Sequence, residues 1–212
     1  MYLLSIFLKG GIIMWPILLC SIIAVAIIID RHLALRKAKI NAPVFMVRIR
    51  GFIKKDDITG AMNFCRQEQS SVSHIIKIGL QKYSLGHIRV KEAIENAGRQ
   101  ELIKLEKGLA VLASISGIAP LLGFLGTVTG MISAFMTIKD LAGAANPSDL
   151  AGGIWEALIT TAFGLIIGIL ALGYYNYFVN YIKKLVGDME NVANDVVDLI
   201  QDQSLEASET NK

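Results

Sequence analysis

Charged side chains are missing from three long stretches of this 212-residue sequence. Only 18% of the residues are charged, whereas 53% are apolar. Residues 10–29 and 108–138 carry no charge, and residues 150–182 carry a single one, Glu156. Typical soluble domains have about 25% charged residues spread over their surface, so this pattern excludes that class and indicates a membrane protein.

Cysteines, histidines and catalytic motifs are also scarce. Cys20 and Cys65 are too few for a disulfide framework, and the three histidines are too dispersed to form a metal site. The sequence has no Gly-x-Ser-x-Gly elbow, no His-Glu-x-x-His pair and no paired aspartates in an apolar stretch. We therefore expect no metal, no cofactor and no enzyme activity. The repeated halves typical of solute carriers are also missing.

Each of the three charge-poor stretches is long enough to cross a membrane. A helix rises about 1.5 Å per residue, so about 20 residues cross a hydrocarbon core of roughly 30 Å. The first stretch just fits, and the other two are longer, which predicts helices that extend into the cytoplasm. The first stretch is also longer than the core of a secretory signal and lacks a cleavage site, so we expect it to be retained.

Basic residues predict the orientation of the chain. All but five of the 21 lysines and arginines lie between Arg31 and Lys107, and Lys183 and Lys184 follow the third stretch. Because positive charge beside a span favours the cytoplasmic side, we expect a periplasmic N-terminus and a cytoplasmic C-terminus. Acidic residues interleaved with the basic ones argue against nucleic-acid binding.

The predicted fold class is thus an all-α membrane protein with three transmembrane helices, two of which extend into the cytoplasm, plus short amphipathic cytoplasmic helices. Its expected parts are an outward-facing N-terminus (1–9), transmembrane helix 1 (10–29), a cytoplasmic helical region (30–107), transmembrane helix 2 with its extension (108–138), a periplasmic loop (139–149), transmembrane helix 3 with its extension (150–182), and a cytoplasmic C-terminal helix and tail (183–212).

Three short helices are predicted between the first two spans. Apolar residues spaced three and four apart begin after Asp57, so we expect Asp56 or Asp57 to cap this helix. A second pattern begins near Ser73 and ends at Gly86. The third begins at Ile88, and because no proline follows it for thirty residues, we expect that helix to run unbroken into the second span.

Small residues concentrate in the second and third spans. In lipid the hydrophobic effect does not drive helix association, so small residues mark faces where helix backbones approach closely. We expect these positions to pack helices together or to line a pore. They are Gly123, Gly126, Gly130, Thr160, Gly164 and Gly168.

Three polar side chains within the spans are candidates for carrying chemistry. Counted from the outer ends of the two spans, Thr127 and Thr161 lie at the same depth, roughly 16 Å below the surface. A hydroxyl both donates and accepts, so it can relay a proton, although it can equally bond a carbonyl of its own helix. Glu156 is costly inside a membrane and therefore a functional candidate, unless its place near the outer end lets it reach the headgroups.

Two segments resemble a known family. They are Ala-Pro-Leu-Leu-Gly-Phe-Leu-Gly-Thr-Val-Thr-Gly-Met at 119–131 and Gly-Ile-Trp-Glu-Ala-Leu-Ile-Thr-Thr-Ala-Phe-Gly-Leu at 153–165. Both are similar to the proton-channel family that includes the ExbB, TolQ and MotA proteins. Three spans rather than four favour the ExbB and TolQ branch, and the segments do not decide between these two.

The resemblance implies a pentamer in the bacterial inner membrane around a pore that holds two single-span partners similar to ExbD or TolR. The partner's membrane aspartate would titrate, and Thr127, Thr161 and Glu156 match pore-lining residues of the family. An ExbB-like subunit would use the proton motive force to energise outer-membrane transport through a TonB-like protein. The alternatives are a TolQ-like subunit of the Tol-Pal system, acting with a TolA-like protein, or a non-conducting membrane scaffold.

Overall fold

A computed structural model describes residues 7, 9–141 and 146–210, and over these residues the chain is all-helical. It divides into two compact units. The first comprises Met1–Asp30 and Gly108–Phe178, and the second comprises Arg31–Lys107 and Val179–Lys212.

In the part of the chain that the structure describes, three helices are long and apolar enough to cross a membrane, which makes the chain a membrane protein. They are α2 (Met14–Ala38), α7 (Leu109–Asp140) and α8 (Pro147–Thr210). Large apolar side chains on all three face outward; Leu121 and Phe124, for example, are 68% and 66% exposed. Such outward apolar surface is expected where lipid or another membrane helix surrounds the protein.

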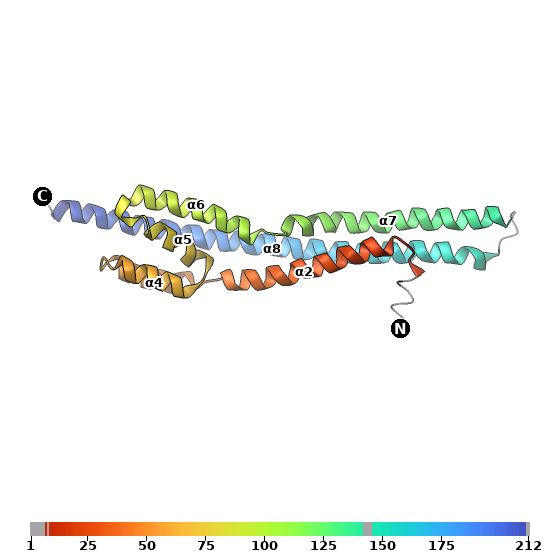
Figure 1. Ribbon diagram of the computed structural model, residues 1–212, viewed down its shortest axis with the longest axis horizontal. Coiled ribbons are helices and arrows are strands. Elements are labelled where there is room, and N and C mark those ends of the chain that lie inside the picture. The colour runs from red at the N-terminus through yellow and green to blue at the C-terminus, as the bar shows by residue number, and fades with distance from the viewer. Residues whose placement is uncertain (1–6, 8, 142–145, 211–212) are drawn as a thin grey trace. The chain divides into compact units, whose positions relative to one another are not determined.

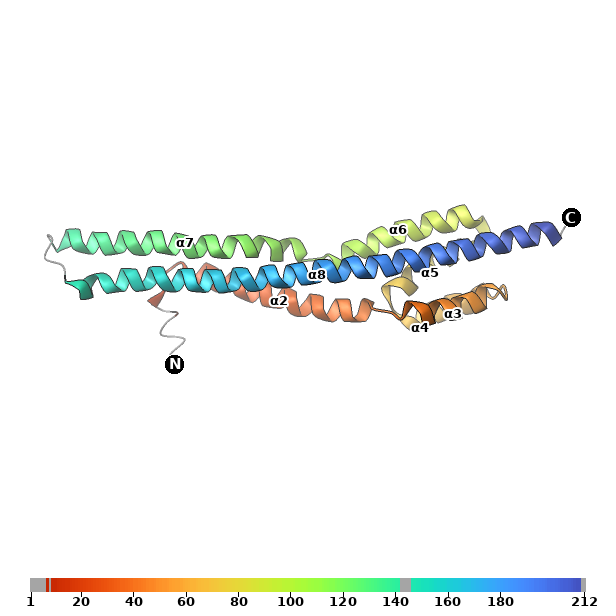
Figure 2. The ribbon, with the colours of Figure 1, turned by 180° about the vertical axis from the view of Figure 1, so that it is seen from behind.

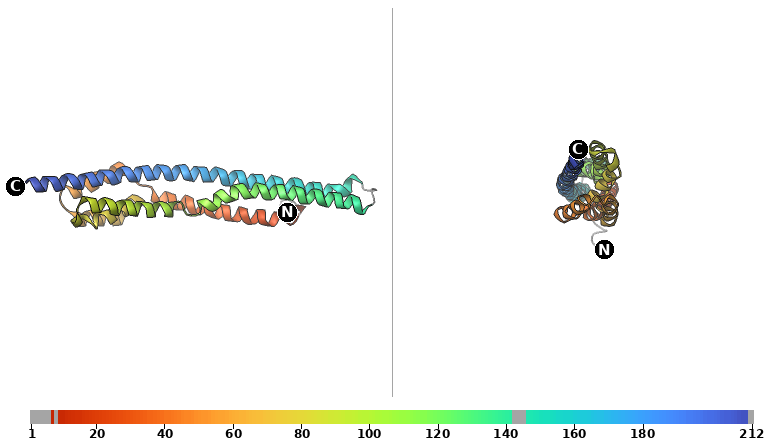
Figure 3. Two further views of the ribbon diagram at one scale, coloured as in Figure 1. Left: turned by 90° about the horizontal axis from the view of Figure 1, so that it is seen from above. Right: turned by 90° about the vertical axis from the view of Figure 1, so that its left-hand side faces the viewer.

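Within the first unit, α7 and the first part of α8 lie side by side, as Figures 1, 2 and 3 show from different directions. α2 packs on one flank of this pair through Met14 and Ile17, which contact Ile159 of α8. Leu122 of α7 and Phe163 of α8 extend the same apolar cluster. The cluster therefore marks which flank of the α7–α8 pair faces α2.

The second unit contains the shorter helices. They are α3 (Ala42–Ile53), α4 (Ile58–Glu68), α5 (Ser71–Leu80), the 3₁₀ turn η1 (Tyr83–Leu85) and α6 (His87–Leu105). Asp57 caps α4 by accepting a hydrogen bond from the Gly60 N–H at 2.8 Å, which confirms the predicted cap. Ser70 and Ser73 form a reciprocal capping box at the start of α5.

Several helix boundaries differ from the prediction. The helix over 87–105 does not run unbroken into the second span, because it ends at Leu105 and α7 begins at Leu109. Gly108 adopts a left-handed backbone with φ +80°, a conformation that interrupts an α-helix and that glycine tolerates best. α5 ends at Leu80 rather than Gly86, since η1 intervenes.

Two further helical features differ from the sequence analysis. The separate C-terminal helix predicted after residue 182 is instead continuous with α8, which runs to Thr210. α3 was not predicted at all: Asn41 caps it and Pro43 occupies its first turn, where a missing N–H costs nothing. Pro43 therefore lies in the first turn of α3, a few residues after α2 ends at Ala38.

Candidate functional site

The contact between α7 and α8 is built from glycine backbones, and we call it the seam. A Cβ added to Gly164 would lie 2.5 Å from the carbonyl oxygen of Ala119 and 2.9 Å from Cα of Gly123. One added to Gly130 would lie 2.6 Å from the carbonyl oxygen of Gly153. Because real Cβ atoms essentially never approach other atoms so closely, the seam depends on residues without side chains.

The small residues predicted from the sequence meet along this seam. Gly123, Gly126 and Gly130 are buried on α7, and Gly126 lies against the side chain of Thr160. Gly168 of α8 lies against Pro120, at the other end of the contact. The spacing of the small residues in the sequence therefore indicates the faces on which α7 and α8 touch.

Thr160 and Thr161 use their hydroxyls differently. Thr160 is fully buried, and its hydroxyl donates to carbonyl oxygens of its own helix, those of Glu156 (2.9 Å) and Ala157 (3.0 Å). The Thr161 hydroxyl is shared between the Ala157 carbonyl at 3.0 Å and the Gly123 carbonyl of α7 at 3.2 Å. Thr161 thus joins the two helices, whereas Thr160 fills the seam.

Thr127 points away from the α2 flank of the pair. At about 100° per residue, it lies roughly 140° round α7 from Leu122, which packs in the α2 cluster. Its hydroxyl donates to the Phe124 carbonyl at 2.6 Å, so it bonds its own helix. Thr127 is half-buried.

Thr161 lies on the same side as Thr127. It is two residues from Ile159 and from Phe163, both of the α2 cluster, and is therefore turned roughly 160° away from each of them. The Gly123 contact places Thr161 close to the level of Thr127, as the depth count predicted. Among the described residues no hydrogen bond joins the two hydroxyls. We call this half-buried side of the seam, defined by Thr127 and Thr161, the threonine flank.

Glu156 lies on the other flank. It precedes Ile159 by three residues and Phe163 by seven, a spacing that puts it on the helix face that packs against α2. Its carboxylate lies directly against Gly11, whose backbone is left-handed with φ +66°. The structure therefore brings the two threonines to one flank and separates Glu156 from them.

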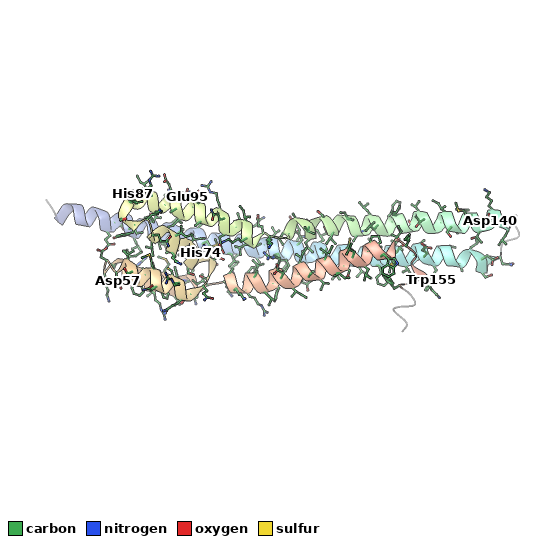
Figure 4. The ribbon with its side chains drawn as sticks, in the orientation of Figure 1. Asp57, His74, His87, Glu95, Asp140 and Trp155 are labelled. Atoms are coloured by element: carbon green, nitrogen blue, oxygen red, sulfur yellow. The ribbon has the colours of Figure 1, made fainter. Side chains whose placement is uncertain are left out.

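The surroundings of Glu156 include a feature that sequence reasoning missed. Gly10 and Gly11 form a turn before α2 begins at Met14, and a side chain at Gly11 would collide with the carboxylate. Nearby, Lys9 Nζ lies 6.0 Å from the ring centre of Trp155, the α8 residue labelled in Figure 4. The Gly10-Gly11 pair was the sequence signal for a turn, but nothing in it indicated a partner on α8.

The chemistry available at the seam is that of hydroxyls and one carboxylate. A threonine that donates to a carbonyl still has lone pairs that accept a hydrogen bond from water or from a partner's acid. Among the described residues, no donor reaches the Glu156 carboxylate and no cluster of three or more histidine, cysteine or acidic side chains is placed to hold a metal. The arrangement can hold or pass a proton.

Several known proteins are similar to this chain in sequence. Residues 67–191 match the MotA/TolQ/ExbB proton channel family. A putative ExbB-like biopolymer transport protein of Synechocystis is 30% identical over 193 residues, covering 84% of this chain and 71% of the relative. A putative ExbB homolog of Methanothermobacter thermautotrophicus is 29% identical, covering 88% of this chain and 66% of the relative.

A third relative covers less of the chain. The biopolymer transport protein ExbB of Xanthomonas campestris is 35% identical over 109 residues, which is 51% of this chain and 43% of the relative. The family match alone extends over more than half of the sequence and includes the whole seam. This chain therefore belongs to the MotA/TolQ/ExbB proton channel family, in its ExbB branch.

Proposed function

We propose that this chain is a proton-conducting subunit of an inner-membrane motor complex, in which the threonine flank lines the proton path. One observation carries the proposal: Thr127 and Thr161 come from different helices to the one flank of the seam that α2 leaves uncovered. Several copies arranged with these flanks inward would surround a polar channel, with α2 on the outside. Such polar residues inside a membrane normally face a protein interior or a wet cavity.

The complex that we propose follows the resemblance to the family. Five copies of the chain surround a dimer of ExbD-like single-span subunits, and the membrane aspartate of that partner takes up and releases the proton. Thr127 and Thr161 hold water or the partner's carboxylate, since neither hydroxyl titrates by itself. The motion is passed to a TonB-like protein that energises transport at the outer membrane.

Glu156 has a separate place in this proposal. It lies toward the outer end of α8 and its carboxylate is half-buried beside Gly11, on the α2 flank. We propose that it takes part only at the outer end of the path, reached from the α2 flank and not from the channel that the threonine flanks surround. The topology follows the positive charges, with residues 30–107 and 183–212 in the cytoplasm and residues 1–9 and 139–149 in the periplasm.

The test compares three threonines of the seam region. Thr127→Val and Thr161→Val remove a hydroxyl from the threonine flank. Thr129→Val is the matched control, because its hydroxyl also donates to a carbonyl three residues back, that of Gly126 at 3.1 Å, but lies roughly 160° round the helix from Thr127. Thr161→Ser restores the hydroxyl.

Each variant would replace the native chain in cells, with gradient-dependent uptake across the outer membrane measured with and without a protonophore. We expect Thr127→Val and Thr161→Val to lower proton-dependent uptake at least tenfold, because positioned proton-transfer groups contribute about 10² to 10⁴ in rate. Thr129→Val and Thr161→Ser should stay near the wild-type rate. A native gel checks assembly, which should survive, since one interhelical hydrogen bond is worth about 0.6 kcal/mol. Full uptake by both valine variants would remove these residues from the path and favour the scaffold.

A further inference from the structure

The second unit contains a basic pocket that the proton path does not use. The pocket has a volume of about 430 Å³ and lies where the end of α2, the end of α4, the start of α5 and the end of α6 meet. His74 on α5, labelled in Figure 4, is one of its exposed lining residues. The cations that line it are Arg31, Lys37, Arg66, Lys77 and Lys104.

The pocket has much more positive than negative charge. Among the described residues that line it, the one carboxylate is Glu101, and it is already engaged: Lys104 Nζ lies 3.0 Å from it, and the Ser71 hydroxyl donates to it at 3.1 Å. No carboxylate of the described residues forms an ion pair with Lys37, Arg66 or Lys77. These three side chains come from three different helices and converge on one cavity, so an anion inside it would be attracted by all of them.

Arg31 has a different role in the same pocket. It is 6% exposed, and its Nη1 donates to the carbonyl oxygens of Lys104 (2.8 Å) and Leu105 (3.3 Å) at the end of α6. A cation there satisfies carbonyls that lack partners within the helix. Arg31 therefore holds the wall of the pocket together and is kept unchanged in the test below.

The position of the pocket along α2 suggests where its ligand comes from. Arg31 follows the charge-free stretch 10–29 within two residues, and Lys37 lies roughly 12 Å beyond Ile29 along the helix. The headgroups of a bilayer occupy this zone, just outside the hydrocarbon core. A lysine's long side chain reaches back toward this layer.

We propose that this pocket binds the phosphate group of an anionic ligand, which is either a phospholipid headgroup from the adjoining leaflet or a free phosphate ester. A guanidinium and two ammonium groups suit phosphate oxygens, the guanidinium as a two-pronged donor and the lysines as point charges. The hydroxyls of Ser70 and Ser73 are used in the α5 capping box, so the cations carry the binding. This differs from a general basic surface, because it predicts one saturable site per chain.

The test uses the detergent-solubilised full chain and native mass spectrometry. Short-chain phosphatidylglycerol, short-chain phosphatidylcholine and glycerol 3-phosphate are titrated separately, and glycerol 3-phosphate is then titrated in competition with phosphatidylglycerol. The triple variant Lys37→Gln, Arg66→Gln, Lys77→Gln is compared with Arg36→Gln, Lys39→Gln, Arg50→Gln. The second triple variant removes the same charge from exposed positions on α2, on the connection after it and on α3, none of which line the pocket. The single variants Lys37→Gln and Arg66→Gln, both exposed, keep the test valid if the triple variant folds poorly.

We expect phosphatidylglycerol to bind at one copy per chain and phosphatidylcholine to bind much more weakly. Each basic residue contributes roughly fivefold, so the pocket triple variant should bind about 100-fold more weakly and each single variant about fivefold. Saturable binding of the lipid without competition from glycerol 3-phosphate identifies a headgroup site, whereas binding of glycerol 3-phosphate alone identifies a free phosphate ester. Binding that is not saturable, or that both triple variants weaken equally, overturns the proposal.

Discussion

Replacing Gly164 with alanine tests whether the seam is as tight as its geometry indicates. The new Cβ would lie 2.5 Å from the Ala119 carbonyl oxygen, where ordinary contact begins at 3.4 Å. The two helix backbones must therefore separate by about 0.9 Å, because neither neighbour is a flexible side chain. Gly173→Ala is the matched control: it lies on the same helix, and a Cβ there meets nothing within 4 Å.

The cost of the Gly164→Ala change has two parts. Overpacking of a tight contact costs about 1 to 3 kcal/mol. The same separation stretches the hydrogen bond from Thr161 to the Gly123 carbonyl, now 3.2 Å, beyond useful length and loses about 0.6 kcal/mol. Alanine gains about 1 kcal/mol of helix propensity over glycine at both positions, so that term cancels in the comparison. Gly164→Ala should thus be about 1.6 to 3.6 kcal/mol less stable than Gly173→Ala.

The assay is unfolding of the purified chain in mixed micelles with increasing dodecyl sulfate, followed by circular dichroism. Gly164→Ala should unfold at a lower dodecyl sulfate fraction than the wild type, and Gly173→Ala at the same fraction or a higher one. If both alanine variants unfold together, the α7–α8 backbones are not in contact at this position, and the seam as described here is wrong.

Two further predictions concern the second unit. Asp57→Ala removes the carboxylate that accepts the capping hydrogen bond of α4 at 2.8 Å, and it should lower the free energy of unfolding by about 1 kcal/mol. The control is Gln67→Ala, at an exposed position of the same helix, which should leave the free energy of unfolding nearly unchanged. Burial raises the pKa of the Cys65 thiol to about 12 despite the opposing charge of Lys77, so at pH 8 iodoacetamide should label Cys65 only after unfolding. Because the folded pKa lies above the ordinary value of 9.0, the neutral thiol favours the fold below pH 9, and this contribution is lost as the pH rises toward 12. Rapid labelling of the folded chain would contradict the buried position.

The features of the fold that were predictable from the sequence are those that the composition of a single segment determines. Long charge-free stretches are visible without knowing any contact, and so is an aspartate placed before an apolar helical pattern, as at Asp57. The break between α6 and α7 was not predictable in this way. Gly117 and Gly173 remain helical while Gly108 turns left-handed, so the residue type alone does not say which glycine ends a helix.

The candidate site was predictable to a similar degree. Spacing of small residues identified the touching faces of α7 and α8, and a residue count placed Thr127 and Thr161 at one level. The sequence could not say on which flank α2 packs, because that depends on contacts of Met14 and Ile17 far along the chain. Glu156 was therefore grouped with the threonines, whereas the structure turns it toward α2 and Gly11.

Packing and the proposed proton transfer are not independent at this seam. The Gly123 carbonyl is within reach of the Thr161 hydroxyl only because Gly123 and Gly164 carry no side chains to hold the helices apart. A glycine substitution therefore changes both helix contact and hydroxyl position, and a loss of activity in Gly164→Ala would not separate a channel from a scaffold. Threonine-to-valine exchange keeps the shape and removes only the hydroxyl, and threonine-to-serine exchange keeps the hydroxyl and removes a methyl group. If the seam stays intact, a proton path requires that Thr161→Val loses activity and that Thr161→Ser keeps it. A packing role does not produce this difference.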